Sequence, residues 1–145
     1  MKAERKPTVL MLDDEKFLLT IYRLKFEKSG YQVSTYYSTD DALQVLRSGF
    51  TPDVILFDIT MPDSRSGYEF IEAVQAERLA KRSLKLALTN EGQDAEKSRL
   101  ADLGADAHLL KANYTPSELV AEVTKRMSAK NARSQRGRLL RDEIS

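Results

Sequence analysis

Apolar and polar positions form alternating blocks along this chain, with short β-rich runs separated by stretches of helical spacing. The apolar runs occupy residues 8–12, 31–37, 53–57, 84–88 and 107–110. In the other blocks, apolar residues recur every three or four positions, which is the spacing of one helix face. Those blocks cover residues 15–29, 40–48, 67–82, 94–103 and 116 onward. The pattern predicts five strands that alternate with five helices.

The run from Val54 to Phe57 has no polar interruption and stops at Asp58. A short unbroken run of this kind is typical of a strand buried on both faces of a parallel sheet. Pro62 follows soon after, and proline cannot donate to a strand ladder. We therefore expect Asp58 to lie where a central strand leaves the core, at the end where open α/β sheets bind ligands.

The helical blocks contain residues that mark the ends of the helices and residues expected on their apolar faces. Thr115 and Glu118 form a capping box around Pro116, a specific signal for the start of a helix. Glycines are expected to end three of the other helices, at Gly30, Gly49 and Gly104. The residues expected on the apolar faces are Phe17, Ile21 and Leu24 in the first helix, Phe70, Ile71 and Val74 in the third, and Leu119, Val123 and Met127 in the last.

Strands that alternate with helices through short linkers predict right-handed βαβ units. The fold class is therefore α/β, a doubly wound five-stranded parallel sheet of order 2-1-3-4-5 with five helices, which is the flavodoxin-like arrangement. This order places the switch point between the first and third strands, and it places the second strand at an edge.

Length and composition narrow the class of protein. A chain of 145 residues that is 41% hydrophobic and 31% charged suits one globular domain with a real core. No apolar stretch approaches the roughly 20 residues of a membrane span, and no secretory signal is apparent. The lack of cysteine fits a reducing cytoplasm, where we expect the protein to reside. The single histidine, His108, argues against a histidine-rich metal site or a Ser-His-Asp triad.

Charge divides the chain into two parts. Residues 1–124 carry 16 basic and 20 acidic side chains, whereas residues 125–145 carry seven basic and two acidic ones. We assign 1–128 to the domain and 129–145 to a basic C-terminal helix extension or tail. The tail is either a solvated helix end, favoured by the helix dipole, or a contact for an acidic partner, a membrane surface or nucleic acid. Too few residues remain for a helix-turn-helix, which argues against DNA binding by this chain alone.

Chemically reactive side chains follow four of the five apolar runs. Asp13 and Asp14 follow the first, Asp58 the third, Thr89 the fourth and Lys111 the fifth. The strand without such a residue is the one that the predicted order places at the edge. Carboxylates at one rim raise one another's pKa, and Mg²⁺ with its preference for oxygen ligands relieves that repulsion. Asp58 could then act as a nucleophile that forms an aspartyl phosphate, with Lys111 and Thr89 binding the phosphoryl oxygens.

Most of these residues, taken alone, could have a purely structural role. Asp13 and Asp14 could merely cap a helix, Thr89 could be a turn residue, and Lys111 could be a solvated lysine. Their coincidence at four strand ends favours a shared site.

With these motifs in place, the sequence resembles the receiver domain of bacterial two-component response regulators, of the single-domain chemotaxis-regulator kind. The resemblance covers roughly residues 7–128. It rests on Met-Leu-Asp-Asp-Glu at 11–15, Phe-Asp-Ile-Thr-Met-Pro at 57–62, Gly-Tyr-Glu at 67–69, Leu-Thr at 88–89 and Leu-Leu-Lys at 109–111.

The resemblance implies a role for each site residue. Asp58 would be the phosphoacceptor, and Asp14 and Asp58 would bind Mg²⁺ directly. Asp13 would act through water, and the backbone carbonyl of Thr60 would complete the metal ligands. Thr89 and Lys111 would bind the phosphoryl group and signal its presence. Residues that would tune its loss are Thr60 and Glu91.

The resemblance also implies partners. A sensor histidine kinase or a histidine phosphotransfer protein would supply the phosphoryl group. A downstream protein, or a second copy of the chain, would dock on the face formed by the fourth helix, the fifth strand and the fifth helix. The chain would catalyse only its own phosphotransfer and dephosphorylation, so it is not expected to be an enzyme in the usual sense.

Four positions depart from the family pattern. Ala112 replaces the usual proline after Lys111, so we predict a trans bond there. His108 stands where an aromatic residue is common, and it is either a half-exposed strand residue or a signalling rotamer that adds pH sensitivity near neutrality. Asn90 replaces a small residue after Thr89. The segment 63–66 is one residue longer than usual and is expected to bulge.

These departures keep other functions open. One alternative is a receiver-like interaction scaffold that no longer switches. Another is a receiver fragment of a larger regulator, with residues 129–145 as its linker. A third is a phosphatase that uses the same aspartyl chemistry, but Thr60 replaces the second carboxylate of an Asp-x-Asp pair.

Overall fold

The computed structural model describes residues 5–61, 66–90 and 94–144, with side chains as far as Gly137 except that of Asp94. The strands are β1 (Thr8–Leu12), β2 (Gln32–Tyr36), β3 (Val54–Asp58), β4 (Leu84–Thr89) and β5 (Ala107–Leu110). The helices are α1 (Lys16–Lys28), α2 (Thr39–Arg47), α3 (Gly67–Ala76), α4 (Asp94–Asp102) and α5 (Pro116–Ile144), with a short 3₁₀ turn η1 (Lys111–Asn113). Each predicted strand and helix is present.

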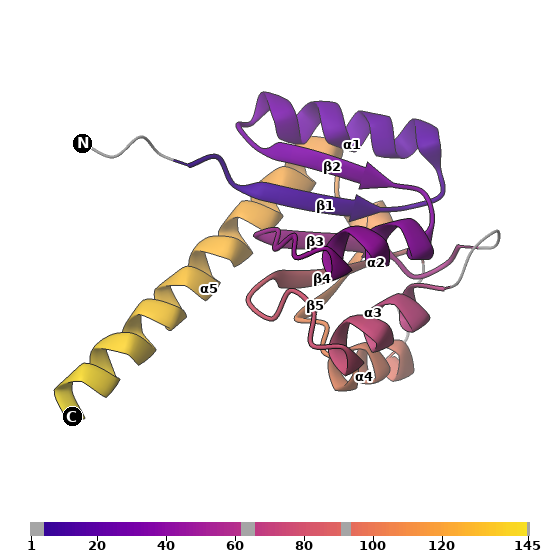
Figure 1. Cartoon of the computed structure of the whole chain (residues 1–145). Coiled ribbons are helices and arrows are strands. Elements are labelled where there is room, and N and C mark those ends of the chain that lie inside the picture. The colour runs from indigo at the N-terminus through magenta and orange to yellow at the C-terminus, as the bar shows by residue number, and fades with distance from the viewer. Residues whose placement is uncertain (1–4, 62–65, 91–93, 145) are drawn as a thin grey trace.

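The strands form one parallel sheet of order β2-β1-β3-β4-β5, which confirms the predicted topology (Figure 1). In the register, Leu12 lies beside Phe57, and Asp58 lies beside Leu88. Thr89 in turn lies beside Leu110. The carboxyl ends of β1, β3, β4 and β5 therefore meet at one edge of the sheet.

Two hydrophobic cores cover the two faces of the sheet. On one face, α1 and α5 pack against Val9, Leu56 and Leu86. On the other, α2, α3 and α4 pack against Leu10 and Phe57. Every residue of β3 is buried, as its unbroken apolar run predicts, because helices lie over both of its faces.

The predicted apolar face of α1 is wrong. Phe17 is 81% exposed and Leu24 is 56% exposed, whereas the buried residues of this helix are Leu19, Tyr22 and Phe26. Apolar side chains surround much of α1, so periodicity alone does not select the face that meets the sheet. The predicted inward residues of α3 are buried, and so are Leu119 and Val123 of α5, while Met127 is partly buried.

Helix α3 ends at Ala76, six residues before the predicted end at residue 82. The backbone turns left-handed at Arg78 and at Ala80, with φ of 57° and 45°. The amide of Leu79 bonds back to the carbonyl of Val74 at 2.9 Å, which closes the helix end. Neither glycine nor proline marks this turn in the sequence, so the residue pattern could not reveal it.

Helix α5 begins at the predicted capping box and runs unbroken beyond the sheet (Figure 1). The amide of Thr115 donates to the Glu118 carboxylate at 2.9 Å, and the amide of Glu118 donates to the Thr115 hydroxyl at 3.1 Å. The predicted boundary at residue 128 falls inside this helix. Near that point Lys130 donates to the carbonyl of Ser83 at 3.0 Å. Within the described residues, no helix is long and apolar enough to cross a membrane.

Candidate functional site

Four strand ends bring the predicted residues to one rim of the sheet. Asp13 directly follows β1, Asp58 is the last residue of β3, and Thr89 is the last residue of β4. Lys111 directly follows β5, where it opens the 3₁₀ turn η1. The parallel register places the carboxyl ends of these strands side by side. Residues almost 100 positions apart in the sequence are therefore neighbours.

Asp58 and Asp13 are nearly enclosed carboxylates, 3% and 2% exposed. One oxygen of Asp58 accepts the backbone amide of Thr60 at 3.2 Å. One oxygen of Asp13 accepts the backbone amide of Glu15 at 3.0 Å. Each bond holds one carboxylate oxygen against its own loop and fixes the orientation of the group.

Lys111 joins the two carboxylates. Its ammonium lies 2.9 Å from the second oxygen of Asp13 and 3.6 Å from the second oxygen of Asp58. Burial alone would lower the pKa of Lys111, but the hydrogen bond to Asp13 and the charges of Asp13 and Asp58 raise it. Lys111 is therefore charged across the physiological range and available to an anion at this rim.

The environment opposes ionisation of Asp58. Burial and the charge of Asp13 raise the pKa of Asp58 to about 7, although Lys111 and the Thr60 amide act in the opposite direction. A carboxyl group that is half-ionised at neutral pH is poorly matched to nucleophilic attack unless another positive charge is present.

The residues at the rim fit a hard divalent cation. Asp13, Asp14 and Asp58 each offer a carboxylate oxygen, and these oxygens lie within 4.8 Å of one another. Carboxylate oxygens suit Mg²⁺, which also keeps several waters. The raised pKa of Asp58 gives the physical reason that such a cation would be favoured here.

Gly67 supports Asp58 in a way that sequence reasoning missed. Its amide donates to the carbonyl of Ile59 at 3.0 Å, which docks the start of α3 on the chain after β3. A Cβ at Gly67 would overlap the backbone carbonyl oxygen of Asp58 and the Cα of Ile59. The sequence signal was present, as a glycine in a motif shortly after Asp58, but its close backbone approach depends on the fold.

The other predicted site residues differ in how deeply they are buried. Thr89 is buried at the end of β4, and Thr60 is exposed. His108 lies inside β5, and both of its ring nitrogens are buried without a hydrogen-bond partner in the described part of the chain. Burial lowers the pKa of His108, which moves its titration away from neutrality and counts against the expected pH sensitivity.

Some predictions concern the loops beside the site. Glu91 and residues 63–65 lie outside the described residues. Ser66, at the end of the lengthened segment, caps α3 by accepting the amide of Glu69 at 3.3 Å. Asn90 is exposed. The bond between Lys111 and Ala112 is trans, as predicted from the missing proline.

Comparison with known proteins gives consistent matches over this region. The family model of the response regulator receiver domain matches residues 9–124. The response regulator SaeR of Staphylococcus epidermidis is 33% identical over 126 residues, which are 85% of this chain and 52% of that protein. SaeR of Staphylococcus aureus is 30% identical over 115 residues, 79% of this chain and 48% of that protein. The chain spans about half the length of the curated relatives it matches.

Solved structures show the same architecture. The chemotaxis response regulator CheY4 of Vibrio cholerae superposes with a TM-score of 0.74 at 27% identity, covering 85% of this chain and 99% of that one. A CheY-like receiver domain protein from Methanospirillum hungatei gives a TM-score of 0.78 at 22% identity, over 89% and 99% of the two chains. The second match supports the fold alone.

Proposed function

Because the chain belongs to the response regulator receiver domain family, we propose that it accepts a phosphoryl group on Asp58 from a histidine kinase or a histidine phosphotransfer protein. The observation that carries this proposal is the arrangement at the rim. Three carboxylates offer oxygens within 4.8 Å of one another, and the Lys111 ammonium lies 3.6 Å from Asp58. A carboxylate nucleophile beside a fixed cation is suited to forming an acyl phosphate.

In the proposed step, a carboxylate oxygen of Asp58 attacks the phosphorus atom of a phosphohistidine. A P–O bond forms, the P–N bond breaks, and the nitrogen's electron pair returns to the donor imidazole. Lys111 neutralises part of the charge on the transferred oxygens. Thr89 would contribute a hydroxyl hydrogen bond from the end of β4.

Asp13, Asp14 and Asp58 would hold Mg²⁺ in this proposal, and the carbonyl of Thr60 would be a further ligand. The cation would supply positive charge that offsets the mutual repulsion of these carboxylates and of the phosphoryl oxygens. By the same reasoning, it would favour the ionised form of Asp58 at neutral pH.

The signal would be read on the face formed by α4, β5 and α5. A groove of about 270 Å³ lies there between α4 and β5, lined in part by Lys97, Ala101 and His108. The phosphate would shift a pre-existing equilibrium between two conformations, and a downstream protein or a second copy would bind one of them. No turnover of an external substrate is proposed.

Acetyl phosphate with Mg²⁺ tests the proposal directly. Intact mass spectrometry should show one phosphoryl adduct that forms in the presence of Mg²⁺ and does not form when EDTA replaces Mg²⁺. The adduct should be absent in Asp58→Asn and retained in Asp102→Asn, a matched change at an exposed position on α4. An adduct that persists in Asp58→Asn, or none in the wild type, would overturn the proposal.

A non-switching scaffold is the second candidate function, and Ala112 is the observation that favours it. The trans bond after Lys111 removes a feature common in the family. Amide NMR spectra with and without acetyl phosphate and Mg²⁺ distinguish the two functions. A switch predicts shifts in α4 and β5 as well as at the rim, whereas a scaffold predicts shifts only around Asp58.

A further inference from the structure

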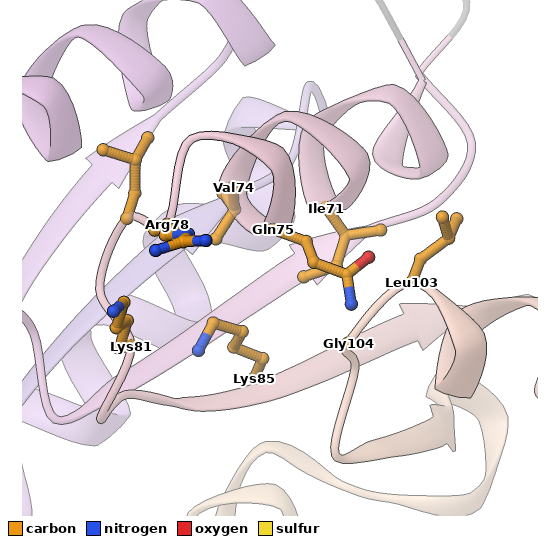
Figure 2. Close-up of a pocket in the computed structure, with 9 residues that line it drawn as sticks. Ile71, Val74, Gln75, Arg78, Lys81, Lys85, Leu103 and Gly104 are labelled. Atoms are coloured by element: carbon orange, nitrogen blue, oxygen red, sulfur yellow. The ribbon is translucent and has the colours of Figure 1, made fainter.

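A cavity of about 240 Å³ opens beside α3 (Figure 2). It lies at the start of the parallel strands, whereas Asp58 is the last residue of β3. Part of its wall is apolar, with Ile71 and Val74 from α3 and Leu103 directly after α4. Lys85, the second residue of β4, also lines it, whereas Thr89 at the far end of the same strand belongs to the proposed phosphoryl site. The cavity is therefore separate from that site.

The rest of the wall carries cationic side chains. Figure 2 shows Arg78, Lys81 and Lys85 grouped at one side of the cavity, with Gln75 on the other side near Gly104. Among the described residues that line the cavity, none is acidic. The combination of apolar walls and positive charge matches a ligand that has an apolar body and an anionic head.

Lys85 is the unusual member of this group because it is only 9% exposed. Its ammonium donates to the carbonyls of Ala80 at 2.8 Å and Ser83 at 3.1 Å. An ammonium has three N–H donors, so one remains for a ligand. In the described part of the chain, no carboxylate forms an ion pair with it, although the Asp106 carboxylate accepts the backbone amide of Lys85.

The charge on Lys85 is poorly compensated. Burial and the charge of Lys130 lower the pKa of Lys85, and the charge of Asp106 only partly opposes them. A buried cation without a counter-ion is costly. An anion that entered the cavity would lower that cost, which gives binding a physical driving force.

The loop beside the cavity is held in an unfavourable conformation. Arg78 and Ala80 adopt left-handed backbone angles, φ of 57° and 45°, although neither is glycine. Such conformations persist where surrounding structure fixes them, and they cluster at ligand sites. Here they direct the Ala80 carbonyl toward Lys85 and place Arg78 at the cavity.

We propose that this cavity binds a small amphipathic carboxylate, with its head group at Lys85 and its apolar body against Ile71, Val74 and Leu103. The volume of about 240 Å³ corresponds to roughly eight water-sized groups at about 30 Å³ each. A ligand with eight to ten non-hydrogen atoms, such as an aromatic or short-chain aliphatic acid, is therefore the expected class. Inorganic phosphate lacks the apolar body and should bind more weakly.

Amide NMR titrations with benzoate, hexanoate and inorganic phosphate test this proposal. Either carboxylate should shift the amides of Leu79, Leu103 and Gly104 with saturation. Lys85→Met should weaken carboxylate binding roughly tenfold or more, the range expected for a charged hydrogen bond. Lys81→Glu should also weaken it, whereas Lys28→Glu, an equivalent change at an exposed end of α1, should leave it unchanged.

The Lys81→Glu variant keeps the test decisive if Lys85→Met disturbs the loop, because Lys81 is exposed. Three results would overturn the proposal. They are a lack of saturable shifts with both carboxylates, equal carboxylate affinity in Lys81→Glu and the wild type, or tighter binding of phosphate than of benzoate. Lys85 would then serve only to hold the carbonyls of the 78–83 loop.

Discussion

Asp58 combines two properties that oppose each other in the protein without a bound cation. It must be ionised to act as a nucleophile, yet burial and Asp13 raise its pKa to about 7. A raised carboxyl pKa means that the folded state binds the proton more tightly than the unfolded state, in which the pKa is about 3.9. The resulting stability is fully present below about pH 4 and is lost as the pH rises through about 7.

Asp58→Asn should therefore stabilise the protein at pH 8 in EDTA, by about 2 kcal/mol once coupling to Lys111 is allowed for. The difference should shrink as the pH falls from 7 to below 4, because the carboxyl then becomes protonated in both states. Urea unfolding at several pH values measures it. Asp102→Asn serves as the exposed control, and an Asp58→Asn variant that is less stable at pH 8 would contradict the prediction.

Gly67 supports a second prediction at the residue scale. A Cβ there would overlap the backbone of Asp58 and Ile59, and backbone atoms cannot move aside as a flexible side chain can. Gly67→Ala should lower the free energy of unfolding by about 1–3 kcal/mol and slow phosphorylation by acetyl phosphate, because it displaces the chain that carries Asp58.

Gly137→Ala provides the matched control for Gly67→Ala. A Cβ at Gly137 meets nothing within 4 Å, and this residue lies within α5. Alanine favours a helix over glycine by roughly 0.5–1 kcal/mol, so Gly137→Ala should be neutral or stabilising. Equal destabilisation by the two substitutions would show that close packing on Asp58 is not the cause.

Secondary-structure elements could be predicted where the sequence carried local signals. The Val54–Phe57 run, the capping box at Thr115 and the glycine at residue 30, with φ of 96°, each specify their structure through nearby residues. The orientation of α1 and the end of α3 depend instead on packing against the sheet. The strand-end residues were predictable as a group because parallel strands share one rim, whereas the cavity at Lys85 depends on the turn after α3.

Helix α1 offers a matched pair of leucines that tests its corrected orientation. Leu19 is 2% exposed and Leu24 is 56% exposed on the same helix. Leu19→Ala should cost about 2–5 kcal/mol, whereas Leu24→Ala should change stability by less than about 0.5 kcal/mol. Chemical denaturation of both variants measures this, and comparable losses would mean that the helix also packs through its outer face.

Charge is distributed unevenly over the whole molecule. The body that contains the sheet is acidic, and the last 21 residues are basic, with seven basic and two acidic side chains. Helix α5 carries this charge away from the sheet (Figure 1). Lys130 donates to the Ser83 carbonyl at 3.0 Å, and among the α5 side chains described as far as Gly137 it is the last with a hydrogen bond to the body.

A chain that ends at Lys130 should therefore keep its fold. Residues 131–136 are exposed, so their removal should change the free energy of unfolding by less than about 1 kcal/mol, as for other exposed sites. Leu119→Ala in the full chain is the contrasting variant, since Leu119 is 1% exposed and its truncation should cost about 2–5 kcal/mol. Urea unfolding compares the two, and acetyl phosphate labelling reports on Asp58. If the shortened chain loses as much stability as Leu119→Ala, the basic extension is part of the folded unit, and the domain boundary lies beyond residue 128.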